Sequence, residues 1–174
     1  MEYEFTLKYQ LSANDCDHDE LVERLAGAGC DDATVGIGQP GRITLTFTRE
    51  ESSAWQAIIS ALQEVKRAVP SARLVEAAPD FVGLTDVAEA TGMTRQNMRK
   101  LMITNALEFP VPIHEGNTSL WHLSDILTWL NARGGYHIDK YLLEIAKTVK
   151  QVNLAKEAGK IESGVVSELE ALFA

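Results

Sequence analysis

The chain has 174 residues, of which 45% are hydrophobic and 24% are charged, and its formal net charge at pH 7 is −9. This length suits one large domain or two small ones, and the acidic balance argues against a protein that coats nucleic acid without specificity. No run of about 18 uncharged apolar residues occurs, so we expect no membrane span. The N-terminus, MEYEFTLKYQ, is acidic and alternating, unlike a signal peptide, which favours a cytoplasmic protein.

The first 78 residues have the pattern of a small α+β domain. The apolar pattern predicts four strands, over residues 3–9, 33–37, 42–48 and 72–77. Helices are expected after two capping boxes, Asp17–Glu20 and Thr48–Glu51. The order βαββαβ predicts a ferredoxin-like domain, one antiparallel sheet backed by two helices. We expect this domain to serve dimerisation or positioning, with ligand sensing as the alternative.

Three motifs in this domain favour simple structural roles. Residues 36–41 match G-x-G-x-x-G, but a strand follows them and Pro40 removes a backbone donor, so we predict a turn rather than a dinucleotide site. The acidic run from Asp15 to Glu20 lacks the glycine and terminal Glu of a calcium loop, which favours a solvated helix start. Cys16 and Cys30 form no CxxC pair, so we expect two reduced thiols, with a regulatory disulfide as the alternative.

Residues 77–80 are the expected joint to a second domain, which begins with two short helices. Thr85 is the predicted N-cap of the first helix, and Gly92 is expected to end it in a left-handed conformation. Thr94 is the predicted N-cap of the second helix. Three apolar side chains at spacings of three and four form one buried stripe on it: Met98, Leu101 and Met102.

The opposite face of that second helix carries cationic and amide side chains: Arg95, Gln96, Asn97, Arg99 and Lys100. Such a face is typical of helices that read base edges and phosphates in the major groove of DNA. Taken alone, it is more typical of a solvated helix surface.

A proline-rich segment follows. Pro110 and Pro112 enforce an extended backbone, and the turn signal at residues 115–117 predicts a hairpin between short strands at 112–114 and 120–122. His114, Glu115 and His122 flank this hairpin, but no third strong ligand follows from their spacing, so we expect solvated histidines rather than a metal site.

A third helix is expected between the predicted cap Ser124 and the stop at Gly134 and Gly135. Its apolar stripe is Ile126, Leu127, Trp129 and Leu130. We expect the two tryptophans of this region, Trp121 and Trp129, to fill the core rather than to stack on bases.

Residues 83–133 resemble the AlpA and excisionase-like small DNA-binding proteins, which share a MerR-type winged helix-turn-helix. The resemblance rests on these residues: Leu84, Ala88, Gly92, Thr94, Arg99, Phe109, Pro110, Pro112, Trp121, Asp125, Trp129 and Leu130. It covers roughly a third of the chain. The family's wing usually carries Arg or Lys near its turn, whereas residues 114–119 of this chain, HEGNTS, carry neither.

Two amphipathic helices are expected after Gly135, over residues 138–158 and 163–173, and they fold back on the body or pair with a second copy. The predicted organisation is therefore an α+β fold of three parts. They are a ferredoxin-like domain at residues 1–78, a winged helix-turn-helix at residues 80–135 and a C-terminal helical extension at residues 136–174.

The resemblance and the cationic face together predict sequence-specific binding of double-stranded DNA by a homodimer, as a transcriptional regulator or a phage-type accessory factor. The residues expected to contact DNA are Thr94, Arg95, Gln96, Asn97, Arg99, Lys100 and Asn117. No nucleophile and base can be paired from the sequence, so we expect no enzyme, cofactor or metal. The main alternative is a protein–protein adaptor with a winged-helix shape, binding a partner through its acidic N-terminal domain. A small-ligand sensor is a third alternative.

Overall fold

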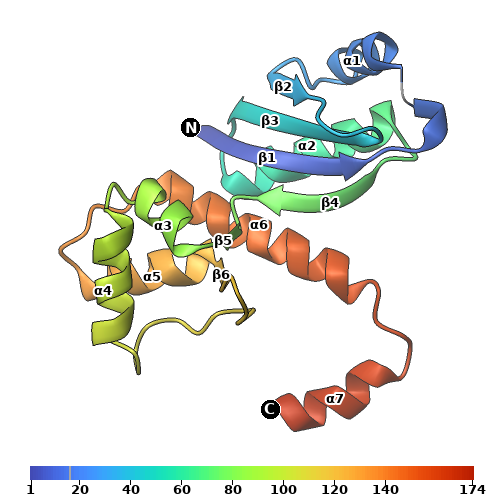
Figure 1. Ribbon diagram of the computed structural model, residues 1–174. Helices are drawn as coiled ribbons and strands as arrows, with labels where there is room; N and C mark the ends of the chain where they lie inside the picture. The colour runs from blue at the N-terminus through green and yellow to red at the C-terminus, as the bar shows by residue number, and fades with distance from the viewer. Residues whose placement is uncertain (16) are drawn as a thin grey trace.

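The computed structural model describes residues 1–15 and 17–174, and its fold is mixed α+β (Figure 1). One lobe is built on a four-stranded sheet, a second lobe on short helices, and one long helix, α6, runs along both. None of the helices among the described residues is long and apolar enough to cross a membrane.

The sheet of the first lobe is antiparallel throughout, in the order β2-β3-β1-β4. Its strands are β1 (Glu2–Gln10), β2 (Ala33–Gly36), β3 (Arg42–Glu50) and β4 (Arg73–Ala78). The alternation predicted for β1 is confirmed, because Tyr3, Phe5, Leu7 and Tyr9 are buried. Phe5 stacks on Phe47 of β3, with ring centroids 5.0 Å apart. The other face of the sheet is polar, as period-two alternation requires.

Two helices pack in this lobe, α1 (His18–Gly27) and α2 (Ala54–Ala68), and a 3-10 turn, η1 (Ala13–Asp15), precedes α1. The predicted N-cap of α1 is confirmed, because Asp17 accepts a hydrogen bond of 3.0 Å from the backbone N–H of Glu20. The predicted capping box at Thr48 and Glu51 is wrong. Residues as far as Glu50 remain paired with β1, so Thr48 lies inside β3, and Ser53 caps α2 instead.

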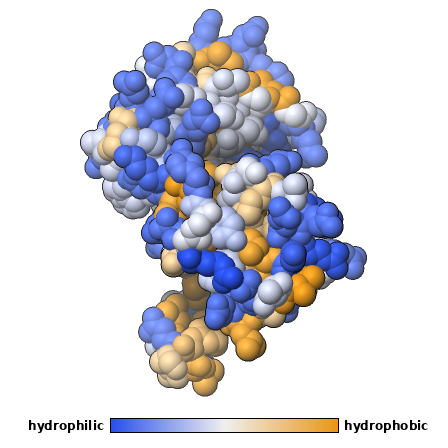
Figure 2. All heavy atoms as spheres, turned by 90° about the vertical axis from the view of Figure 1, so that its left-hand side faces the viewer, coloured by the Kyte–Doolittle hydropathy of each residue, from blue (hydrophilic) through white to orange (hydrophobic). Residues whose placement is uncertain are grey.

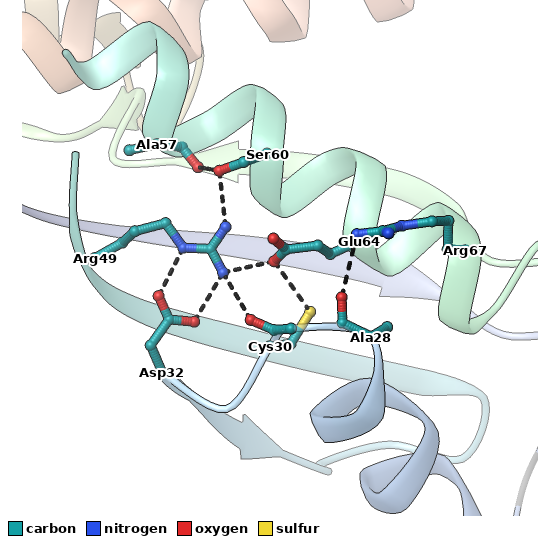
Figure 3. A network of polar contacts seen from close by, with 9 residues as sticks. Ala28, Cys30, Asp32, Arg49, Ala57, Ser60, Glu64 and Arg67 are labelled. Atoms are coloured by element: carbon teal, nitrogen blue, oxygen red, sulfur yellow. Dashed lines mark hydrogen bonds and ion pairs between the residues drawn. The ribbon is translucent and has the colours of Figure 1, made fainter. Parts of the chain in front are cut away.

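Arg49 joins three elements of this lobe (Figure 3). Its buried guanidinium donates to both carboxylate oxygens of Asp32, at 2.6 and 2.8 Å, and to Glu64 of α2 at 2.7 Å. A buried charge is tolerated when it is paired and hydrogen-bonded in this way. Cys30 lies beside the network, and burial raises the pKa of its thiol to about 11, which leaves the thiol unreactive at neutral pH. Cys16 lies outside the described residues.

The turn between β2 and β3 is the G-x-G-x-x-G segment of residues 36–41, as predicted. Gly41 has a φ of +74°, a conformation that favours glycine. The turn leads directly into β3, and no helix follows to present its N-terminus to a phosphate.

The second lobe contains a two-stranded pairing and three helices: β5 (Phe81–Val82), α3 (Leu84–Ala90), α4 (Arg95–Thr104), β6 (Trp121–His122) and α5 (Leu123–Arg133). The core predicted for α5 is confirmed, because Ile126, Leu127 and Leu130 are buried. The predicted cap Ser124 is wrong. Leu123 follows β6 directly and donates its N–H to the carbonyl of Asp80 at 2.7 Å, so α5 begins before Ser124.

The start of α3 also differs from the prediction. Gly83, rather than Thr85, is the N-cap residue, and its backbone N–H donates to the carboxylate of Asp86 at 2.8 Å. An acidic side chain at the third position of a helix commonly satisfies the N-cap N–H in this way. The first-turn capping predicted for Thr85 is therefore absent from α3, and Asp86 satisfies the N–H of the N-cap residue instead.

Helix α6 (Lys140–Ala158) contributes to the hydrophobic cores of both lobes. Ile145 and Val149 are buried in the sheet lobe, whereas Ala146 is buried in the helical lobe. The hydroxyl of Tyr3 donates to Glu144 at 3.0 Å, and Lys150 donates to Asp125 of α5 at 2.7 Å. The last helix, α7 (Val165–Phe173), stands apart from both lobes, and all of its residues are exposed (Figure 1).

Candidate nucleic-acid interface

The turn between α3 and α4 fixes how α4 is presented. Gly92 has a φ of +66°, and the next residue, Met93, donates its N–H to the carbonyl of Ala88 at 2.8 Å. The predicted cap of α4 is confirmed, because the hydroxyl of Thr94 accepts a hydrogen bond of 3.2 Å from the N–H of Asn97. Met98 is fully buried and anchors the inner face of α4 in the lobe.

The predicted outward face of α4 is exposed. Arg95, Gln96, Asn97, Arg99 and Lys100 all lie on the surface. Within the part of the chain that the structure describes, none of the three cationic side chains has an ion-pair partner. Residues 95–100 contain no acidic residue, so this face is locally positive although residues 80–134 carry six acids and four bases.

The loop of residues 109–120 faces α4. Its ends are joined by one bridge, in which the N–H of Leu120 donates to the carbonyl of His114 at 3.0 Å. The indole N–H of Trp121 donates to the carbonyl of Pro110 at 3.0 Å, and the Trp121 ring packs edge-on against Phe109. The expectation that Trp121 fills the core is confirmed, since 4% of its surface is exposed.

The predicted hairpin of two short strands at 112–114 and 120–122 forms only around one bridge. His114 pairs with Leu120, and the N–H of Ile113 also donates to the carbonyl of Leu120 at 2.8 Å. Trp121 and His122 instead form β6, which pairs with Phe81–Val82 of β5. Pro110 and Pro112 have no N–H to donate, so a longer ladder along this segment cannot form. The strand that pairs with β6 is β5, which precedes α3 in the chain.

An open groove of about 930 Å³ separates α4 from this loop. Arg95, Arg99, Met102 and Ile103 line one side, and Val111, Pro112, Glu115 and Asn117 are among the residues that line the other. We call it the α4–loop groove. It brings together three of the predicted DNA-contacting residues, Arg95, Arg99 and Asn117. Gln96, Asn97 and Lys100 do not line it, because they lie elsewhere on the exposed face of α4.

The α4–loop groove combines charge with exposed apolar surface. Ile103 has 59% of its surface exposed and Val111 has 83%, and the neighbouring Leu107 is fully exposed. Figure 2, which looks at the side of the molecule on which α4 lies, shows hydrophilic and hydrophobic residues next to each other there. A groove of this composition can bind an anionic partner that also presents apolar groups.

A buried polar cluster behind the loop was missed by the sequence reasoning. The Nδ1 atom of His122 lies 2.6 Å from a carboxylate oxygen of Asp80, and Asn153 of α6 donates to the other carboxylate oxygen at 2.8 Å. Asn153 also exchanges two hydrogen bonds with the backbone of Ala77, at 2.7 and 2.9 Å. The cluster ties the end of β4, β6 and α6 together, and so positions the loop relative to the sheet.

The expectation that His114 and His122 are both solvated is wrong for His122, which is 7% exposed and bound to Asp80. His114 lies at the surface. Among residues 1–15 and 17–174, no group of three or more His, Cys, Asp or Glu side chains is arranged to hold a metal ion.

Comparisons of the chain with family models, curated proteins and solved structures found no match.

Proposed function

We propose that the chain binds double-stranded DNA in a sequence-specific way, with residues 80–135 acting as a winged helix-turn-helix and α4 entering the major groove. The observation that carries this proposal is the face of α4 opposite the buried Met98. It holds two amides and three cations without an ion-pair partner in the part of the chain that the structure describes, and no acidic residue interrupts it between residues 95 and 100. Cations neutralise phosphates, whereas amides and arginine read base edges.

Each polar residue of this surface has a proposed role. Gln96, Asn97 and Arg99 read base edges, because amide and guanidinium groups form bidentate pairs with adenine and guanine. Arg95 and Lys100 bind phosphates, and Thr94 caps α4 beside the DNA backbone. Asn117, exposed in the loop, contacts DNA from the second side of the α4–loop groove.

The N-terminal lobe is proposed to be a ferredoxin-like domain. Strand order β2-β3-β1-β4 with two intervening helices supports this assignment. We propose that it positions the DNA-binding lobe in a cytoplasmic homodimer that acts as a transcriptional regulator or a phage-type accessory factor.

A protein–protein adaptor is the second candidate. The observation that favours it is the apolar part of the α4–loop groove, where Ile103, Leu107 and Val111 are exposed. Glu115 stands in the loop, and residues 114–119 contain no Arg or Lys. A loop of this composition suits a protein surface better than a phosphate backbone.

The two candidates are separated by selecting bound duplexes from random genomic fragments with the purified full-length chain at low salt. DNA binding predicts recovery of fragments that share a short motif, and binding to that motif must survive an excess of unrelated duplex. Recovery of fragments without any shared motif, or of none above the background of the empty support, contradicts the proposal and leaves the adaptor.

A further inference from the structure

Helix α7 has an apolar face that no described residue of its own chain covers. All residues from Glu157 to Ala174 are exposed. Five large apolar side chains of α7 fall at helical spacings on this exposed segment: Val165, Val166, Leu169, Leu172 and Phe173. In Figure 2 they gather at the foot of the molecule. An isolated helix of this length is marginal in water, so a partner for this face is expected.

The charge of this segment limits the kinds of surface to which α7 can bind. Residues 161–174 contain three acids, Glu162, Glu168 and Glu170, and no Lys or Arg. Repulsion between these acidic side chains therefore disfavours the pairing of two α7 helices. A helix without cations is also unsuited to an anionic membrane surface, since interfacial helices carry Lys and Arg on their polar face. The partner of α7 must combine apolar surface with unpaired positive charge.

The α4–loop groove has this combination. On its α4 side, Arg95 and Arg99 lie beside the exposed side chain of Ile103, opposite Val111, and neither arginine has an ion-pair partner among the described residues. Asp86 of α3 and Glu115 of the loop also line the groove, so its positive charge is confined to the α4 side. A second cavity, near Arg24 and Arg67, does not have it. That cavity is lined by Gly27, Ala28 and Ala68, and its Arg24 is already paired with Asp15 at 2.8 Å.

The reach of the linker indicates which copy supplies the helix. The end of α6 is held at the sheet lobe, where Lys156 donates to the carbonyl of Val75 at 2.5 Å. That end and α4 lie on opposite sides of Figure 1. The linker of residues 159–164 extends about 20 Å at most. We therefore assign the docked helix to a second copy, and the association state of the chain tests this choice.

We propose that α7 of one copy docks into the α4–loop groove of a second copy, with its apolar face against Ile103 and Val111 and with Glu168 and Glu170 facing Arg95 and Arg99. This is an amphipathic helix bound in a groove. The proposal does not rest on DNA binding. If the chain does bind DNA, an occupied groove withholds Arg95 and Arg99 from it, so association through α7 competes with DNA binding and differs from the homodimer proposed to bind DNA.

The test is a charge exchange in the full-length chain, followed by sedimentation equilibrium without DNA. The groove variant is Arg95→Glu with Arg99→Glu, the helix variant is Glu168→Arg with Glu170→Arg, and the third protein carries all four changes. All positions are exposed, so none of the variants removes core packing. We expect each double variant to raise the dissociation constant of the dimer by about tenfold or more, and the fourfold variant to restore most of it.

Three outcomes overturn the proposal. A wild-type chain that stays monomeric over the whole concentration range excludes docking between copies. Docking of α7 within its own chain would give this result. A groove variant that associates like the wild type shows that α7 binds elsewhere. A fourfold variant that associates as weakly as the double variants shows that the two sets of charges do not face each other. Because no DNA is present, a failure of the DNA-binding proposal does not affect these results.

Discussion

Arg49 and Arg99 show how the same side chain serves two purposes in one chain. Arg49 is buried against Asp32 and Glu64, and its charge is used to join β3, α2 and the segment before β2. Arg99 projects from α4 into solvent without an acidic partner among the described residues. A paired, buried charge stabilises a structure only if both partners remain, whereas an exposed unpaired charge is available to a ligand.

Lys100 tests whether the cations of α4 bind phosphates. We expect Lys100→Ala to reduce the slope of log affinity against log salt by about one, because one phosphate contact and its released counterion are lost. The measurement is fluorescence anisotropy with the selected duplex at several salt concentrations. Lys66→Ala, which removes the same charge from α2 in the sheet lobe, is the control and should leave the slope unchanged. Equal slopes for wild type and Lys100→Ala would contradict the assignment.

The hydrogen bonds that Asp15 accepts should make the stability of the fold depend on pH. Hydrogen bonds from Ser71, Arg24 and Ser12 lower the pKa of Asp15 from 3.8 to about 2. Because the folded-state pKa is the lower one, its contribution to stability is complete above pH 4 and is lost as the pH falls towards 2. The difference in unfolding free energy between wild type and Asp15→Asn should therefore shrink over that interval.

Urea unfolding at pH 6, 4 and 2.5 measures this difference. Asp31→Asn is the control, since Asp31 is exposed and makes none of these bonds. A difference between wild type and Asp15→Asn that is the same at all three pH values would show that the carboxylate is not held by its neighbours.

At the scale of elements, the predictions that the structure confirms are those that depend on local sequence pattern. Periodicity found β1, α4 and the stripe of α5, and local chemistry found the caps Asp17 and Thr94. The errors came from contacts distant in sequence. β3 extends beyond Thr48 because β1 pairs with it, and β6 pairs with Phe81–Val82, which a periodicity argument on two residues cannot detect.

The candidate site also has one part that local sequence pattern predicts and another part that it does not. The exposed face of α4 could be predicted, because a stripe of Met98, Leu101 and Met102 forces the polar residues outward. The α4–loop groove and the Asp80–His122–Asn153 cluster could not, because each brings together segments that are far apart in the chain. An aspartate, a histidine and an asparagine spread over 73 residues give no local signal.

Gly92 tests the turn that presents α4. No atom lies within 4 Å of a Cβ built on Gly92, so an alanine fits the available space, but the φ of +66° strains any residue with a side chain. We expect Gly92→Ala to lower the unfolding free energy by about 1–2 kcal/mol. Chemical denaturation measures it. Gly38→Ala, which also has open space but no positive φ, is the control and should cost less. Equal effects would contradict the strain argument.

For the whole molecule, α6 makes the two lobes one unit. Its side chains enter both hydrophobic cores, and Asn153 binds the backbone of β4 together with the carboxylate of Asp80. The orientation of the α4 face relative to the sheet lobe therefore depends on contacts made by a helix that follows both lobes in sequence. A homodimer formed through the sheet lobe would present its two α4 helices at a spacing that α6 sets.

Asn153→Ala tests this connection. It leaves the N–H and carbonyl of Ala77 and one oxygen of Asp80 without their buried partner, so we expect a loss of roughly 2–4 kcal/mol in unfolding free energy. Asn131→Ala, at an exposed position of α5, is the control and should change stability by less than about 0.5 kcal/mol. Similar losses for both variants would show that the cluster does not join the lobes.

DNA binding through α4 is tested most directly by the affinity of the full-length chain for a selected duplex, compared between Arg99→Ala and Arg42→Ala. Both variants remove one exposed arginine, the first from α4 and the second from β3. We expect Arg99→Ala to weaken specific binding by about 1–3 kcal/mol, and Arg42→Ala to leave it within experimental error of wild type. Equal affinities for wild type and Arg99→Ala, or equal losses in both variants, would contradict it.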